Sequence, residues 1–326
     1  PMDLLEHHSK VWAGHWNAHV EKDVLDTISA CREAISRAKD DATTARVVYT
    51  ADEIRAACKE FKSKTAIGAD HWSFKDLMCM PDQLLESLGQ LLGETQGDAV
   101  PPLQAMGNIL ASLPKSSGGI RTVGIAITLY RLLMALDNKK LAEFEAAHAH
   151  ENDSAKAGAS ALRAAEERSF QCELALEEGK SVMGLLWDIE KFFDSINIGI
   201  LLREAIRWGF PIKQLALSLI VHLAPRRLKL GAAIGNPITR LGRSILAGCK
   251  RSTQFARLIT LQMVRNLNTW HPEVTIFIHV DDMSNLVIED SEANMVARAL
   301  EYAIVCSKET QRLRLTISKK SCTVPR

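Results

Sequence analysis

The sequence predicts an α+β fold in which a helical N-terminal part precedes two regions that contain β-structure. Three observations support this class. The first 45 residues show helical periodicity without a β-rich run, and residues 110–127 read as a β-hairpin. From residue 182 onward the expected order is strand, helix, strand, strand, helix, strand, once a split in the first helix is omitted. That βαββαβ order is typical of a ferredoxin-like split βαβ sheet.

The N-terminal segment, residues 1–64, contains helices only. Trp12 and Trp16 share a stripe with several histidines, which indicates an amphipathic helix that packs its aromatic face on the rest of the protein. A histidine metal site is the weaker reading of the same stripe. Thr50 is a candidate N-cap for a second helix, because Glu53 stands three residues later and completes a capping box.

Residues 65–178 follow as a second region. Its hairpin consists of ILASLPK and IRTVGIAI, joined through Ser117-Gly118-Gly119. The helices expected around it are 82–94, 128–150 and 161–178.

Residues 179–326 form the third region, which opens with SVMGLLWD, an apolar strand that ends in Asp188. Two further strands, TIFIHV and MSNLVIE, meet across the acidic pair Asp281–Asp282. The other elements expected here are helix 197–222 with a break at 209–211, loop or short strands at 226–250, helices 252–267 and 291–312, and a last strand at 313–317.

The composition indicates an ordinary globular protein. The chain has 326 residues, 40 Lys and Arg, 39 Asp and Glu, and a net charge of +1, which argues against a binder that acts through a basic tail. No apolar run approaches the length of a membrane span, so no membrane partner is expected. No signal peptide is evident and the seven cysteines are scattered, which favours an intracellular location, nuclear or cytoplasmic, over secretion.

The charges are unevenly distributed. Residues 205–272 contain 11 basic residues and no Asp or Glu, whereas the rest of the chain has 29 basic and 39 acidic residues. Charge runs are usually solvated faces, but an acid-free span of this length suggests a surface that faces phosphates.

Three aspartates of the third region stand where a strand ends or where two strands meet in a turn. In a βαββαβ sheet the first strand lies beside the central hairpin, so Asp188 can converge with Asp281 and Asp282. An ordinary acidic β-turn is the simpler reading of the pair alone. Close like charges need a cation, and oxygen ligands favour Mg²⁺ or Mn²⁺. Two such ions would activate a 3′-hydroxyl and stabilise a leaving pyrophosphate.

These motifs resemble reverse transcriptases, most closely those of the non-LTR retrotransposon and group II intron type. WDIEKFFDSI, HVDD and LRLTISKKS resemble three consecutive palm motifs, and LPKSSGGIRTVGI resembles the fingers hairpin. GADHWSF and RSILAGCKRST resemble two further motifs of the family, and all six occur in the family's order over about residues 65–323. The resemblance implies a right-hand polymerase with residues 1–64 as a helical extension, 65–178 as a fingers-like region and 179–326 as the palm.

The resemblance also implies roles for single residues. Asp188, Asp281 and Asp282 would bind two Mg²⁺ or Mn²⁺ ions, with help from the backbone carbonyl of Ile189, and Lys320 would give a proton to pyrophosphate. The other roles implied are nucleotide binding by Lys115, Arg121, Ile189, Phe193 and Gly248, and nucleic-acid binding by Arg226, Arg227, Arg243, Lys250 and Arg251.

Phe193 is the most informative of these residues. A bulky ring below the sugar would exclude a 2′-hydroxyl, so the resemblance implies a preference for dNTPs, whereas RNA-dependent RNA polymerases usually have Asp there. The alternative is that Phe193, like Phe192, simply packs in the core.

The sequence departs from the family pattern at several positions. Leu246-Ala247 replaces a Pro-Gln pair, Thr122 replaces a Pro, and His279 replaces an aromatic residue. The chain ends directly after the last palm motif, so we expect the thumb and any endonuclease segment to lie in a longer parent chain.

The leading hypothesis is RNA-templated DNA synthesis within a retroelement, with an RNA template, a DNA or RNA primer and dNTPs as partners. Three alternatives stay open: an RNA-dependent polymerase that accepts ribonucleotides, an inactive reverse-transcriptase-like domain that binds RNA or acts as a scaffold, and, more distantly, a nucleotide cyclase.

Overall fold

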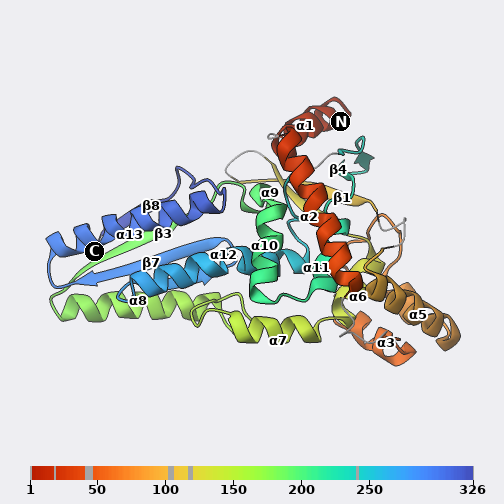
Figure 1. Ribbon diagram of the computed structural model, residues 1–326, viewed down its shortest axis with the longest axis horizontal. Coiled ribbons are helices and arrows are strands. Elements are labelled where there is room, and N and C mark those ends of the chain that lie inside the picture. The colour runs from red at the N-terminus through yellow and green to blue at the C-terminus, as the bar shows by residue number, and fades with distance from the viewer. Residues whose placement is uncertain are drawn as a thin grey trace. The chain divides into compact units, whose positions relative to one another are not determined.

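The chain has an α+β fold, with helices and, among the residues that the structure describes, two four-stranded sheets (Figure 1). It divides into two compact units, a first unit of residues 1–144 and 196–252 and a second unit of residues 145–195 and 253–326. The expected break at residues 41–44, the hairpin turn at 117–119 and Arg240 lie outside the described residues. The computed structural model describes residues 2–17, 20–40, 47–101, 106–116, 120–239 and 242–325.

The first unit is mostly helical. Each unit is made of two separate stretches, and the three-part division into 1–64, 65–178 and 179–326 stays a prediction. The elements of the first unit are α1 (Met2–Trp16), α2 (Val20–Asp40), α3 (Ala51–Lys59), α4 (Phe74–Met78), α5 (Asp82–Asp98), β1 (Asn108–Pro114), β2 (Ile120–Ile125), α6 (Thr128–Leu136), the start of α7 (Lys139–His148), α10 (Ile198–Trp208), α11 (Ile212–His222), β4 (Arg226–Leu230), β5 (Ala233–Ile234) and the start of α12 (Lys250–Trp270).

The N-terminal helices are integral to the core of the first unit. Trp16 is fully buried and Trp12 stacks on it, which confirms the predicted aromatic face of α1. The capping box at Thr50 is also confirmed, because its hydroxyl accepts from Glu53 N and the Glu53 carboxylate accepts from Thr50 N. Capping of this kind satisfies backbone donors that have no partner inside the helix.

The first sheet contains the predicted hairpin. β1 and β2 pair antiparallel from Ile109–Ile125 to Pro114–Ile120. The sheet order is β2-β1-β4-β5, and β4 pairs parallel with β1. The strands within the basic stretch therefore extend the hairpin sheet, a long-range pairing that local sequence patterns do not encode.

Two glycines of α5 allow another segment of the chain to lie directly on the helix. A Cβ at Gly89 would lie 1.8 Å from the carbonyl oxygen of Tyr49, and one at Gly93 would lie 1.7 Å from that of Val47. Only glycine allows so close an approach of two backbones. The Tyr49 hydroxyl then donates to Gln96 Oε1 at 2.6 Å and fixes this packing.

The second unit contains the other sheet. Its elements are the end of α7, α8 (Ala161–Glu177), β3 (Ser181–Trp187), α9 (Phe192–Ser195), the remainder of α12, β6 (Thr275–His279), β7 (Asp282–Glu289), α13 (Glu292–Arg312) and β8 (Cys322–Pro325). The chain passes between its strands β3 and β6 through the first unit, where helices α10 and α11 break at Gly209–Pro211 as predicted.

The strand order of the second sheet is β6-β7-β3-β8, and each neighbouring pair is antiparallel. Two antiparallel steps make β3 and β6 parallel to one another, with β7 between them. In Figure 1 β3 and β7 lie side by side, and their register runs from Ser181–Glu289 to Trp187–Met283. The first strand therefore lies beside the acidic hairpin, as the sequence order predicts.

The last strand lies further along the chain than predicted. The prediction placed it at residues 313–317, whereas β8 spans Cys322–Pro325. Leu313 is the C-cap of α13 and Arg314 adopts a left-handed φ of 57°, so the chain is still turning where a strand was expected. Ile317 makes only an isolated bridge with Ile189.

Two expectations from composition can be compared with the structure. The seven cysteines are free thiols, and four of them, Cys58, Cys172, Cys249 and Cys306, are buried. None of the described helices is both long and apolar enough to cross a membrane.

Candidate active site

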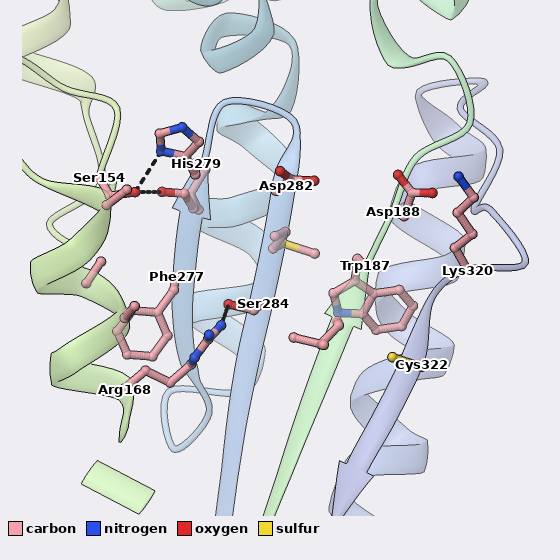
Figure 2. A pocket seen from close by; sticks show the side chains of 16 residues that line it. Ser154, Arg168, Trp187, Asp188, Phe277, His279, Asp282, Ser284, Lys320 and Cys322 are labelled. Carbon is pink, nitrogen blue, oxygen red and sulfur yellow. Dashed lines mark hydrogen bonds between the residues drawn. The ribbon is translucent and has the colours of Figure 1, made fainter. Parts of the chain in front are cut away.

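Asp188 and Asp282 lie on adjacent strands at one end of the second sheet. Asp188 follows β3 directly, one residue beyond the pair Trp187–Met283, and Asp282 is the first residue of β7. Both line a cavity of about 330 Å³ in the second unit, together with His279 and Lys320 (Figure 2). The two carboxylates therefore line one shared cavity.

The register of the sheet explains which side chains reach this cavity. Phe277, Ser284, Leu186 and Cys322 are paired across the four strands and form one row. Side chains two residues along a strand return to the same face. The next row of that face consists of His279, Asp282, Asp188 and Lys320, which line the cavity with the first row.

Asp281 occupies the turn between β6 and β7. This two-residue turn closes on the pair His279–Asp282, and Val280 has a φ of +60°. A positive φ is strained for a β-branched residue and costs about 1–2 kcal/mol. Burial raises the pKa of Asp281, and the charges of Asp282 and Asp188 raise it further. The third carboxylate is thus electrostatically coupled to the other two.

The donor chemistry of these residues fits a hard divalent cation. The groups are carboxylates, which Mg²⁺ and Mn²⁺ prefer, and their mutual repulsion is what a bound cation would relieve. Among the described residues, however, no three His, Cys, Asp or Glu side chains are already arranged as a metal-binding cluster. The carboxylates are coupled in charge without forming a complete coordination shell.

The segment that carries Lys320 is tied to the backbone of Asp188. Ser318 N donates to Asp188 O at 2.7 Å, and Asp188 N donates to Ser321 Oγ at 3.0 Å. The hydrogen bonds of the Ile189–Ile317 bridge are made by the flanking residues, so Ile189 O takes no part in them. Lys320 itself is exposed and reaches the cavity from the side of β8.

The two adjacent phenylalanines differ in environment. Phe192 is 2% exposed and belongs to the core, whereas Phe193 is half-buried and meets the Phe192 ring edge-on. Phe192 is therefore a core residue, whereas Phe193 is only partly buried.

The nucleotide-binding residues predicted on the fingers belong to the first unit. Lys115 follows β1 and Arg121 lies in β2, and both are exposed. Gly248 has a φ of +95°, and a Cβ there would lie 2.8 Å from Val123 Cγ1. Only glycine fits this position, because both its conformation and its contact with β2 exclude a side chain.

The Leu246-Ala247 departure has a structural explanation. Leu246 is buried in the core of the first unit, and Ala247 O accepts from Gly124 N at 2.6 Å. The pair therefore joins the turn before α12 to the hairpin strand β2, and the apolar Leu246 side chain fills core space.

Two residues predicted to bind nucleic acid are instead buried. Arg226 is 0% exposed, donates to Ser244 Oγ at 2.7 Å and His222 O at 3.0 Å, and lies over the Trp16 ring. Arg251 is 3% exposed and pairs with Asp137 at 3.9 Å. The prediction that these two guanidinium groups face phosphates is wrong, because each is used inside the first unit.

The remaining basic residues of the span 205–272 have mixed environments. Arg227 and Lys250 are exposed and Arg243 is half-buried, so these three predicted contacts remain accessible. Arg257 pairs with Glu145 and Asp153 in the second unit. The acid-free span is divided between the two units, and part of it forms their interiors.

Sequence reasoning missed the loop at residues 150–156. Residues 151–160 have the composition of a polar loop rich in small residues, yet Ser154 Oγ lies 3.0 Å from His279 Nδ1 at the cavity. No spacing rule connects residues 125 positions apart. The HVDD motif could direct attention to His279, but nothing in the sequence indicates its partner.

Comparison with family models identifies the family of the chain. Residues 113–325 match the model of the reverse transcriptase (RNA-dependent DNA polymerase) family, a stretch that includes the three carboxylates and most of the hairpin. Because the match covers well over half of the chain, the protein belongs to the reverse transcriptase family. A comparison with curated proteins found no match.

Proposed function

We propose that this chain synthesises DNA on an RNA template by transferring dNTPs to the 3′-hydroxyl of a primer. Family membership supports nucleotidyl transfer of the reverse transcriptase type in general. The observation that carries the specific proposal is the shared cavity of Asp188 and Asp282, to which Asp281 is coupled by charge. The proposal includes a palm formed by the second sheet, whose strand order supports it.

The proposal assigns Asp188, Asp281 and Asp282 to two divalent ions, Mg²⁺ or Mn²⁺. When bound, such ions lower the pKa of the attacking hydroxyl and stabilise charge on the leaving group. Lys320 lines the same cavity, which supports the proposal that it gives a proton to a departing pyrophosphate. Lys115 and Arg121, both exposed, are proposed to bind the triphosphate.

Nucleic acid would contact the accessible cations and not the buried ones. Lys250 and Gly248 line a second cavity of about 350 Å³ in the first unit, which also contains Arg131 and Phe61. Charged and aromatic groups together suit a nucleotide, through phosphate contacts and base stacking. We propose an RNA template and a DNA or RNA primer as partners, within an intracellular retroelement.

Primer extension tests this function. The protein expressed from the full reading frame is incubated with an RNA template, an annealed primer, dNTPs and Mg²⁺ or Mn²⁺. The DNA products are then resolved by length. We expect metal-dependent extension that falls by at least about 10³-fold in Asp188→Asn and Asp282→Asn, because each removes a charge that the transition state requires. Asp290→Asn, an exposed acid beyond β7, is the matched control.

Two results would contradict the proposal in different ways. RNA binding without extension in either metal would favour the scaffold alternative. Equal use of NTPs and dNTPs would favour a polymerase that accepts ribonucleotides.

A further inference from the structure

The loop at residues 150–156 pairs with β6 like an additional short strand. Ile278 N donates to Asn152 O at 3.1 Å, and Ser154 N donates to Ile278 O at 2.9 Å. These bonds form a parallel bridge between Asp153 and Ile278. The Asn152 side chain adds a bond to Ile276 O at 3.1 Å. The loop is therefore attached to β6, the strand that leads into the turn at Val280 and Asp281. We call this turn the catalytic turn.

The loop is held from its other side by α12. Asp153 is 2% exposed, accepts from Ala155 N at 2.8 Å and pairs with Arg257 Nε. Arg257 also pairs with Glu145, and Asn268 contacts His150 at 2.8 Å. A buried carboxylate with these partners has little freedom to move. Ser154 is thus presented to β6 by a fixed backbone.

The hydroxyl of Ser154 lies between two polar groups. Ser154 Oγ is 3.1 Å from Ile278 O and 3.0 Å from His279 Nδ1. A hydroxyl has a single proton. If Ser154 donated it to His279, two oxygen atoms would face each other at 3.1 Å without a hydrogen between them. If His279 Nδ1–H donates to Ser154, both contacts are hydrogen bonds. The second arrangement satisfies every group, and in the neutral ring it leaves Nε2 as an acceptor.

The contact with Ser154 involves His279, the residue directly before the strained turn. His279 precedes Val280, whose positive φ must be maintained by its surroundings, and the turn aims Asp281 and Asp282. Figure 2 shows the His279 ring held against Ser154 on the same face of the sheet as Asp282.

We propose that Ser154 is a positioning residue, which fixes the ring orientation and the Nδ1–H tautomer of His279 and so holds the catalytic turn in its productive conformation. This inference rests on the proposed function for its kinetic consequence. Its structural content, the tautomer and its dependence on Ser154, does not require activity.

The first test measures the tautomer directly. The ten histidines are labelled with ¹⁵N, and two-bond ¹H–¹⁵N correlation spectra assign the protonated nitrogen of each ring. The His279→Gln variant identifies the His279 signals by their loss. We expect Nδ1–H in the wild type and in Ser154→Thr, which keeps the hydroxyl, and a shift toward Nε2–H in Ser154→Ala. An Nε2–H ring in the wild type would overturn the proposal.

The second test separates positioning from binding and folding. In Ser154→Ala, kcat for primer extension should fall by about tenfold, since small misplacements of reacting groups cost this much or more. The KM for dNTP and the Kd for primer–template should stay within about twofold. Ser154→Thr should recover most of kcat, and Thr269→Ala, which removes an exposed helix hydroxyl, is the control.

The outcomes distinguish this inference from the proposed function. An inactive wild type that shows the expected tautomer pattern would refute the polymerase and keep the Ser154–His279 pair. An active Ser154→Ala enzyme with unchanged kcat would refute the positioning role and keep the polymerase. Melting temperatures of all variants identify any loss of rate that arises from unfolding.

Discussion

Phe192 and Phe193 show how two adjacent rings can serve different purposes. Phe192 is buried, while Phe193 is half-buried beside it. The sequence alone could identify the pair but could not decide which ring was the core residue, because a four-residue helix follows no clear amphipathic pattern.

Substitution at Phe193 tests its proposed role in sugar selection. Phe193→Val should lower the ratio of kcat/KM for dNTP over NTP by about tenfold or more, because the smaller side chain leaves room for a 2′-hydroxyl. Competition between dNTPs and NTPs in primer extension measures this ratio. Phe192→Val is the control, and it should lower stability by on the order of 2–3 kcal/mol without changing the ratio.

The buried His222 should make the free energy of unfolding of the first unit depend on pH. Burial lowers the pKa of His222 to about 3, and the neighbouring Arg226 and Arg251 contribute to this shift. In the unfolded chain a histidine has a pKa of about 6.5. Between these values the unfolded state binds the proton and the folded state does not, so this residue makes the folded state less stable as the pH falls.

Above pH of about 6.5 both states are neutral at His222 and the contribution vanishes. Below it, the loss approaches about 1.4 kcal/mol per pH unit until the folded-state pKa is reached. Urea unfolding between pH of about 7 and about 4.5 measures this slope. His222→Gln should reduce the slope, and an identical slope in that variant would assign the acid sensitivity to other groups.

At the scale of elements, two glycines of α5 determine how residues 47–50 pack on this helix. Gly89 and Gly93 both lie against backbone carbonyls, whereas a Cβ added at Gly97 of the same helix would meet no atom of the described residues within 4 Å. The sequence shows the three glycines but not which of them face a neighbour, since that depends on a contact with a distant segment.

This difference gives a matched pair of substitutions. Gly93→Ala should destabilise the protein by on the order of 2–4 kcal/mol, because the helix and residues 47–48 must separate. Gly97→Ala should be neutral or stabilise by about 0.5–1 kcal/mol, because alanine favours a helix. Urea unfolding of both variants checks the prediction. Equal effects would show that the backbone contact at Gly93 is not maintained in solution.

Elements with local signals were predicted accurately, whereas two features that depend on long-range partners were not. The capping box at Thr50, the hairpin strands β1 and β2, and the break at Gly209–Pro211 all follow from residues close in sequence. The parallel pairing of β4 with β1 and the shift of the last strand to 322–325 depend on tertiary contacts. Strand boundaries near turns are the least determined by local sequence.

At the scale of the whole molecule, charge counting locates cations without showing whether they are exposed. The acid-free span 205–272 includes the buried Arg226 and Arg251 as well as the exposed Arg227 and Lys250. A guanidinium can be buried when carbonyl and hydroxyl oxygens accept its hydrogen bonds and an aromatic ring stacks against it. A charge profile of the sequence shows none of these partners.

The salt dependence of RNA–DNA binding tests this division. Lys250→Gln should reduce the magnitude of the slope of log K against log salt by about 0.7–0.9, the contribution of one phosphate contact. Lys10→Gln changes the same charge outside the span and should leave the slope unchanged. Arg226→Gln should lower the melting temperature instead. A normal slope in Lys250→Gln would remove this lysine from the proposed interface.

The candidate site could be predicted at the level of its carboxylates but not of its supporting residues. Asp188, Asp281 and Asp282 stand at strand ends, where sequence order and sheet topology bring them to one end of the sheet. Ser154, Arg257 and Ser321 act through contacts between distant segments, and their residue types are common in any loop or helix.

The 150–156 loop has a further consequence for the assembly of the second sheet. An outer strand with unpaired backbone groups invites pairing with another chain. On β6 the backbone N–H and C=O of Ile278 are occupied by the loop, through Asn152 O and Ser154 N. At the opposite border, β8 pairs with β3 alone among the described strands. The loop therefore closes β6 to strand addition at Ile278, whereas β8 is the other edge strand of the sheet among the described residues.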